Sequence, residues 1–223
     1  MVAVSTWRQL SDIPVLREGE IHLYRLHLDE AIDQYQNLLS DDEIIRAERL
    51  LDPQKQQFFI TGRGQLRQIL SRYLHTSPEK IIFQYNDSGK PSLSPVYGSD
   101  ITFNLSHSAH LAVVAVTCHS DVGIDIEKID PDLEFLQLAS NFFSQKEQQR
   151  LQGVSFHKQR RTFYRLWTIK EALLKMTGTV FFYSEADGFS AARSYHFFLS
   201  SEFVATVAVV GEIQIFSRFD VSA

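Results

Sequence analysis

The segment DVGIDIEKID, residues 121–130, combines the pattern of a β-strand with a pair of acidic side chains. Val122, Ile124 and Ile126 supply the apolar alternation of a strand, and Asp125 and Glu127 lie among them at positions two apart. Side chains two apart in a strand project from the same face, with Cβ atoms roughly 7 Å apart. The sequence therefore predicts a strand that carries two carboxylates on one side, next to an apolar core.

Two interpretations of this acidic pair are open. In the simpler one, Asp125 and Glu127 lie at a strand edge and face water. In the other, they bind a hard cation, because two neighbouring carboxylates repel one another unless a metal neutralises them. Mg²⁺ usually completes its coordination with waters and substrate phosphates, so this interpretation also predicts a third protein ligand and a phosphorylated substrate.

The segment WTIKEALLK, residues 167–175, offers that third ligand. Trp167, Glu171 and Lys175 are spaced i, i+4, i+8 and so share one face of a predicted helix. Taken alone, the pattern is typical of a surface Glu–Lys pair beside a core tryptophan. Together with the acidic pair, it allows Glu171 to reach the metal and Lys175 a phosphate oxygen. Lys170 points elsewhere and is expected to approach another part of the ligand.

Two further segments suit anion binding better than catalysis. FNLSHS, residues 103–108, has no Gly-x-Ser-x-Gly elbow around Ser106 and no acid placed to orient His107, which argues against a Ser–His hydrolase. The turn NDSGKPSL, residues 86–93, places Lys90 beside Pro91 but lacks the Walker pattern. We expect these residues to contact an anionic ligand.

Composition bounds the class of protein. The 223 residues are 44% hydrophobic and 22% charged, enough for a packed core, and the net charge of −5 argues against nucleic-acid binding. Basic residues gather at 44–72 and 158–175, as solvated helix faces or as a local site for a small polyanion. No apolar run reaches membrane-spanning length, no secretory signal is evident, and the single Cys118 cannot form an internal disulfide. A cytoplasmic protein without membrane or nucleic-acid partners is expected.

The predicted elements suggest an α/β (α+β) fold that repeats itself. Strand patterns are expected at 20–29, 81–85, 101–108, 110–118, 122–126 and 203–216, and helices at 40–51, 55–75, 142–151 and 160–176. LAVVAVT resembles FVATVAVV, and FFITGRGQLRQIL resembles FYRLWTIKEALLK, each pair late in its half. The sequence predicts two similar subdomains, residues 1–119 and 120–223, packed tightly together.

The order of these motifs resembles the 4′-phosphopantetheinyl transferase superfamily, in its long single-chain form. The resemblance spans roughly residues 20–210, and five segments carry it: GKPSL (89–93), FNLSHS (103–108), VGIDIEKI (122–129), FFSQKE (142–147) and RLWTIKEALLKMTG (165–178). Members are similar to one another in being pseudodimers that bind coenzyme A in the cleft between two α/β halves. The resemblance therefore implies a cleft site and, since the duplication is internal, a monomer.

The resemblance also implies roles for individual residues. Asp125, Glu127 and Glu171 would be ligands of Mg²⁺, with Mn²⁺ left open as a substitute, and Lys175 would contact the diphosphate. The remaining coenzyme contacts would come from Arg46, Arg63, Lys90, Pro91, Ser106, His107 and Lys170. His107 and Arg63 would meet the 3′-phosphate, and Lys90 would flank it and the adenine.

The implied reaction transfers the 4′-phosphopantetheine arm of coenzyme A to a serine of an apo acyl or peptidyl carrier protein and releases 3′,5′-ADP. Glu171, or a metal-bound water that it holds, would accept the serine proton. The sequence departs from the family after Gly178, where a second glycine of the usual motif is missing. Two alternatives remain: a module that binds carriers or coenzyme A without turnover, and a metal-dependent hydrolase of a nucleotide diphosphate.

Overall fold

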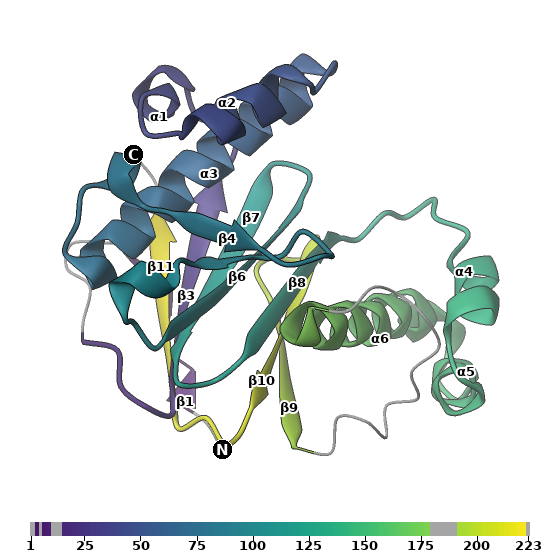
Figure 1. The fold of residues 1–223 in the computed structure, drawn as a ribbon. Coiled ribbons are helices and arrows are strands. Elements are labelled where there is room, and N and C mark those ends of the chain that lie inside the picture. The colour runs from purple at the N-terminus through teal and green to yellow at the C-terminus, as the bar shows by residue number, and fades with distance from the viewer. Residues whose placement is uncertain (1–2, 5, 10–14, 179–190, 222–223) are drawn as a thin grey trace.

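Two β-sheets lie face to face between two long helices in the computed structural model, which describes residues 3–4, 6–9, 15–178 and 191–221 (Figure 1). The strands are β1 (Ala3–Val4), β2 (Arg8–Gln9), β3 (Glu20–His27), β4 (Phe83–Tyr85), β5 (Pro91–Leu93), β6 (Ile101–Ser108), β7 (Leu111–Cys118), β8 (Val122–Lys128), β9 (Ala192–Phe198), β10 (Phe203–Val210) and β11 (Ile215–Val221). The α-helices are α1 (Asp33–Gln36), α2 (Asp41–Glu48), α3 (Pro53–Leu74), α4 (Phe135–Phe142), α5 (Gln145–Gln152) and α6 (Phe156–Thr177). Short 3-10 turns cover Pro78–Lys80 and Pro95–Tyr97.

The layers are held by three apolar interfaces. Alternate residues of β3 and β7 face α3, which contributes Leu66, Ile69 and Leu70. The opposite faces of the same strands pack against β8 and β10 of the second sheet. The other face of that second sheet is covered by α6. The order of layers is therefore helix, sheet, sheet, helix, and the predicted α/β class is confirmed.

The repeat expected from the sequence is visible in the elements. Both α3 and α6 are 22 residues long. In the larger sheet β7 lies between β3 and β6, and in the smaller sheet β10 lies between β8 and β9. Both strands are buried along almost their whole length, as their continuous apolar sequences predict. Two similar α/β halves, as expected of a pseudodimer, are thus present; the boundary at residue 120 stays a prediction.

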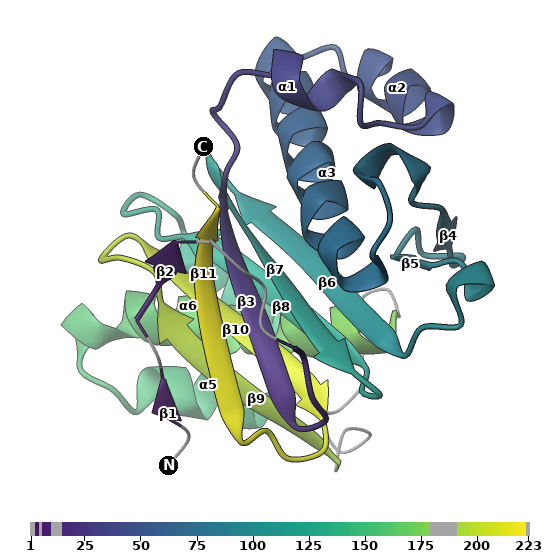
Figure 2. The same ribbon diagram turned by 90° about the vertical axis from the view of Figure 1, so that its left-hand side faces the viewer.

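One strand of the second half joins the sheet of the first. Within the described residues, the larger sheet has the order β1-β11-β3-β7-β6, and β2 also pairs with β11. Figure 2 shows β11 beside β3, to which it runs parallel. Asp220 pairs across this junction with Arg25, 195 positions earlier, and with His27 at 3.2 Å. The two halves consequently share a sheet as well as a core.

Some elements differ from the sequence prediction. The predicted strand at 81–85 is short and pairs with β5, so the turn at residues 86–90 closes a small hairpin. The helix predicted at 142–151 begins at Gln145, because Ser144 is its N-cap and forms a capping box with Glu147, and the short helix α4 before it was not predicted. The altered segment after Gly178 lies mostly outside the described residues. None of the helices in the described part of the chain combines the length and apolarity needed to cross a membrane.

Gly123 allows α6 to lie directly on β8. A Cβ atom at this position would lie 2.0 Å from Ala172 O and 2.3 Å from Met176 N, both backbone atoms of the helix. Because neither can move aside alone, Gly123→Ala is expected to lower the free energy of unfolding by about 3 kcal/mol or more. Urea unfolding measures this. Gly62→Ala is the control: its Cβ meets only the end of the Leu28 side chain, at 3.2 Å, so a change within about 1 kcal/mol is expected.

Candidate active site

Asp125 and Glu127 face α6 rather than open solvent. Ile124 and Ile126 enter the core between the sheets, which turns the alternate positions of β8 toward the helix. The side chain of Asp125 is only 4% exposed, while Glu127 is half-buried. The interpretation of a strand edge with both carboxylates in water is therefore wrong, because the helix covers this face of the strand.

Lys175 of α6 is the direct partner of Asp125. Its Nζ donates to Asp125 Oδ1 at 2.6 Å and to Ser106 Oγ at 2.9 Å, so that α6, β8 and β6 meet at one point. Burial raises the pKa of Asp125, and the charge of Lys175 opposes that rise. Sequence periodicity predicts that Lys175 shares a helix face with Glu171. Its ion pair with Asp125 is visible only in the tertiary structure.

The three carboxylates influence one another electrostatically. Burial raises the pKa of Glu127 to about 7, and the charges of Asp125 and Glu171 contribute. The pKa of Glu171 is also raised, first by burial and then by the charge of Asp125. Burial is the main cause of these shifts, and the positive charge of Lys175 opposes each of them without cancelling it.

The three acidic residues have the right kind of ligand atoms for a divalent cation, but they do not converge on one point in this structure. Among the described residues, no three His, Cys, Asp or Glu side chains lie close enough to form a metal centre. However, Asp125 Oδ2 is buried and has no hydrogen-bond partner among those residues. Oxygen donors of this kind are the ligands of Mg²⁺. The donor set thus fits a hard cation, with Lys175 providing the positive charge beside Asp125 in this structure.

Polar side chains of β6 accept the backbone hydrogen bonds that a neighbouring strand would accept from this edge of β8. Asn104 Oδ1 accepts from Ile124 N at 2.8 Å, Ser106 Oγ from Ile126 N at 3.4 Å, and Ser108 Oγ from Lys128 N at 3.0 Å. The two serines also donate to carboxylates, Ser106 to Asp125 and Ser108 to Glu127, each at 3.1 Å. The polar residues of β6 and the backbone donors of β8 both recur at every second position, so they pair in register. The same strand, β6, therefore also holds the two acidic side chains of β8.

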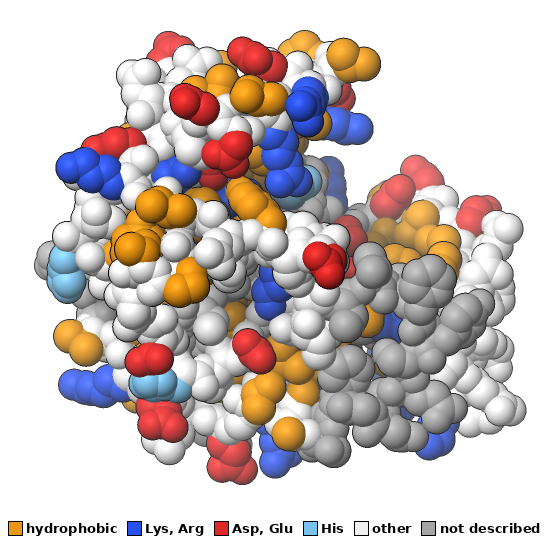
Figure 3. Space-filling model, in the orientation of Figure 1, with side chains coloured by type: hydrophobic (Ala, Val, Ile, Leu, Met, Phe, Trp, Pro, Cys, Tyr) orange, Lys and Arg blue, Asp and Glu red, His pale blue; other side chains and the backbone are white. Residues whose placement is uncertain are grey.

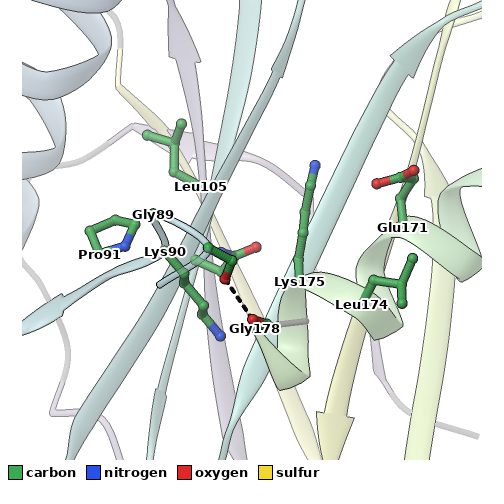
Figure 4. A pocket seen from close by; sticks show the side chains of 10 residues that line it. Gly89, Lys90, Pro91, Leu105, Glu171, Leu174, Lys175 and Gly178 are labelled. Carbon is green, nitrogen blue, oxygen red and sulfur yellow. Dashed lines mark hydrogen bonds between the residues drawn. The ribbon is translucent and has the colours of Figure 1, made fainter. Parts of the chain in front are cut away.

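A cavity of about 370 Å³ lies next to this cluster. Figure 4 shows Glu171 and Lys175 extending from α6, with Lys90 and Pro91 on the hairpin turn across from them. Lys90 Nζ donates to Met176 O at 3.0 Å and to Val122 O at 3.2 Å, so it ties the hairpin to the end of α6. Burial lowers its pKa. The cavity therefore lies between the two halves.

A second cavity, of about 400 Å³, continues from the first through shared lining residues Gly89, Pro91 and Leu105. Four basic side chains line it: Arg46, Lys55, Arg63 and His107. Figure 3 shows Lys and Arg side chains gathered on the part of the molecule formed by α2 and α3, beside the notch that separates it from α4 and α5. Burial lowers the pKa of His107, and the charge of Lys175 lowers it further. The cavity suits an anionic ligand with an apolar or aromatic part.

Not every predicted residue joins this cluster. Lys170 donates to Glu147 of α5 at 3.3 Å and is not among the described residues that line the two cavities. Arg46 lies over the ring of Phe59, 5.4 Å from its centre, at the rim. Sequence reasoning missed Asn104 and Ser108, although polar residues at every second position of an otherwise apolar strand were a visible pattern. Lys55, near the start of α3, belongs to the basic segment 44–72 that the sequence analysis considers as a polyanion site, and it lines the second cavity.

Two α/β halves with a basic cavity, and beside it a second cavity lined by Lys175 and Glu171, suit an enzyme for a phosphorylated ligand. Comparison with known proteins agrees. Residues 28–119 match the family model described as 4′-phosphopantetheinyl transferase, N-terminal, and residues 121–208 match that of the 4′-phosphopantetheinyl transferase superfamily.

Individual relatives carry the same name. The chain is 40% identical over 177 residues to the 4′-phosphopantetheinyl transferase HetI of Nostoc sp., covering 78% of this chain and 75% of the relative. It is 35% identical over 150 residues to psf-1 of Bacillus pumilus, covering 66% and 61%, and 28% identical over 161 residues to Sfp of Bacillus subtilis, covering 70% of each. The chain belongs to the 4′-phosphopantetheinyl transferase superfamily, which confirms the resemblance seen in its motifs.

Proposed function

We propose that this transferase moves the 4′-phosphopantetheine arm of coenzyme A onto a serine hydroxyl of an apo acyl or peptidyl carrier protein. The hydroxyl oxygen attacks the β-phosphorus, the bond between the two phosphates breaks, and 3′,5′-ADP leaves. The observation that carries the proposal is the contact of Lys175 with both Asp125 and Ser106, beside a cavity that shares lining residues with the basic one. An elongated ligand with phosphates at two places matches that shape and charge.

The basic cavity is assigned to the adenosine end of the coenzyme. His107, Arg63 and Arg46 would bind the 3′-phosphate, since they line the cavity and no carboxylate is among its described lining residues. The first cavity is lined by Lys90, Pro91 and Lys175. Ser106 accepts a hydrogen bond from Lys175. Lys170, paired with Glu147, would reach the coenzyme only by giving up that ion pair.

The reacting diphosphate is assigned to the end of the first cavity, where Lys175 would offset the negative charge that develops there. Glu171 lines the same cavity. Because burial and Asp125 raise its pKa, it is a better proton acceptor than an ordinary glutamate, and we assign it, or a water that it holds, as the base for the serine hydroxyl.

A magnesium ion held by Asp125, Glu127 and Glu171 would supply positive charge to the diphosphate oxygens when bound. The raised pKa of Glu127 and the buried Asp125 Oδ2, which has no hydrogen-bond partner among the described residues, support this assignment. Whether Mn²⁺ serves equally is part of the test below. The cytoplasm is the proposed location, and a monomer the proposed state.

The function is tested by incubating the protein with coenzyme A, Mg²⁺ and several apo carrier proteins. Each accepted carrier should gain the mass of one phosphopantetheine arm, and 3′,5′-ADP should appear in equal amount. Replacing Mg²⁺ with Mn²⁺ or with a chelator tests the metal. No mass gain on any carrier, with coenzyme A still bound, would favour a binding module; release of 3′,5′-ADP without a carrier would favour a hydrolase.

A further inference from the structure

Arg63 is held in an unusual environment within the basic cavity. Its guanidinium lies between the rings of Phe83 and Phe59, 5.1 and 5.7 Å from their centres, and its side chain is 10% exposed. Nη1 is buried and has no hydrogen-bond partner among the described residues. Burial lowers the pKa of Arg63, and the negative charge of Glu43 opposes that shift. An anionic ligand would stabilise this buried cation, because it would accept a hydrogen bond from the unpaired donor and offset the cost of desolvation.

Glu43 is the one carboxylate that forms an ion pair with Arg63 in the described part of the chain. Its Oε1 lies 3.4 Å from Arg63 Nε, as an ion pair without a hydrogen bond, and this oxygen has no hydrogen-bond donor among the described residues. The Glu43 side chain is only 1% exposed. Its other oxygen accepts from Arg67 Nε at 2.7 Å and from Ser40 N at 3.0 Å, so the carboxylate is fixed from two directions.

Arg67 differs from Arg63 in having its donors used within the protein. Besides Glu43, it donates to Pro78 O, Ile81 O and Ser40 Oγ at 2.9 to 3.1 Å. It lies one helical turn beyond Arg63, and the two guanidinium groups would repel one another without the carboxylate between them. Glu43 therefore connects an anchored arginine to one that lines the cavity.

We infer that Glu43 is a positioning residue that fixes Arg63 for the 3′-phosphate, and so sets the preference of the enzyme for 3′-phosphorylated coenzyme. The charge of the carboxylate holds the guanidinium from its Nε side, at 3.4 Å, and Nη1, which has no partner among the described residues, stays available to a phosphate. The inference rests on the proposed function, because it assumes that the basic cavity receives the adenosine end. It adds a residue that has no contact with the ligand and that also belongs to the capping box at the start of α2.

The test compares coenzyme A with 3′-dephospho-coenzyme A as substrates, with one apo carrier held constant. Glu43→Gln keeps the size of the side chain and can still accept from Ser40 N, but it loses the charge. We expect it to raise the KM for coenzyme A about tenfold, because Arg63 loses the charge that holds its guanidinium in place, and to change the KM for the dephospho form less than twofold. Because KM does not depend on the amount of folded enzyme, partial unfolding does not imitate this result.

Three further variants separate positioning from stability. Asp220→Asn removes the charge of another ion pair, with Arg25, at the junction of β11 and β3, and should leave the ratio of the two KM values unchanged. In an Arg63→Met background, Glu43→Gln should add no further increase in the KM for coenzyme A, because its effect acts through Arg63. If Glu43→Gln prevents folding, Glu43→Asp, which keeps the charge but shortens the side chain, should give a smaller change in the same ratio.

The outcomes distinguish the two levels of the argument. If the wild-type enzyme uses both coenzyme forms equally well, the assignment of the basic cavity to the 3′-phosphate is wrong. The role of Glu43 then fails with it. A wild-type enzyme that prefers coenzyme A, together with a Glu43→Gln variant that raises both KM values equally or neither, would overturn the role of Glu43 alone.

Discussion

Asp125→Asn is expected to reduce the transfer of phosphopantetheine by about a thousandfold or more while leaving the protein folded. The substitution keeps the shape of the side chain but removes the charge that pairs with Lys175 and that would hold the metal. The raised pKa of Asp125 shows that ionisation of this buried group costs stability. The neutral amide should therefore raise, or at least preserve, the midpoint of thermal unfolding at pH 7, in the absence of divalent ions.

The measurement has two parts: the rate of mass gain on an apo carrier, and thermal unfolding followed by circular dichroism. Asp132→Asn is the matched control, since Asp132 is an exposed acid a few residues beyond the same strand, and its activity should stay within about twofold of wild type. Retention of a tenth or more of the activity by Asp125→Asn would contradict the proposed role. A lower unfolding midpoint would show that the ion pair with Lys175 outweighs the cost of burial.

Lys175→Met should lower kcat by about a hundredfold or more, with a smaller effect on the KM for coenzyme A. Its ammonium lies at the meeting point of β6, β8 and α6, where it would act on charge that develops during transfer. Methionine preserves the length and apolar stem of the side chain, so the packing beside the cavity should change little. Steady-state kinetics with varied coenzyme A separates the two parameters.

Lys158→Met provides the comparison for this substitution. Lys158 is exposed near the start of α6 and carries the same charge. Its kinetic parameters should match those of wild type. Lys175→Arg keeps the charge but replaces a compact ammonium with a planar group, and we expect it to recover only part of the lost kcat. A Lys175→Met variant with unchanged kcat and a raised KM would mean that the lysine binds substrate without assisting the transfer.

Much of the fold could be predicted because its patterns are local. The capping box of Ser40 and Glu43, the two long helices and the alternation of β8 each follow from residues a few positions apart. The continuous apolar sequence of β7 also predicts its central place. These are the features that short-range sequence periodicity encodes.

The arrangement of the site depended on contacts between distant segments. Nothing near Asp125 in the sequence indicates that Lys175, fifty positions away, supplies its counter-charge. In the same way, Glu43 appears locally as a helix cap, and its pairing with Arg63 and Arg67 follows only from the packing of α2 on α3. The motif order suggested which residues act together, but distances and burial determine how each of them is charged and held.

The place of β11 has a consequence for how the chain folds as it is made. During translation, residues 20–118 leave the ribosome long before residues 215–221, so β3 emerges without the parallel strand that covers one of its edges. Phe219, which stacks on Tyr24, is also missing at that stage. An open edge with apolar side chains beside it invites pairing with other chains. The nascent first half should therefore be a preferred client of cellular chaperones until the final strand closes it.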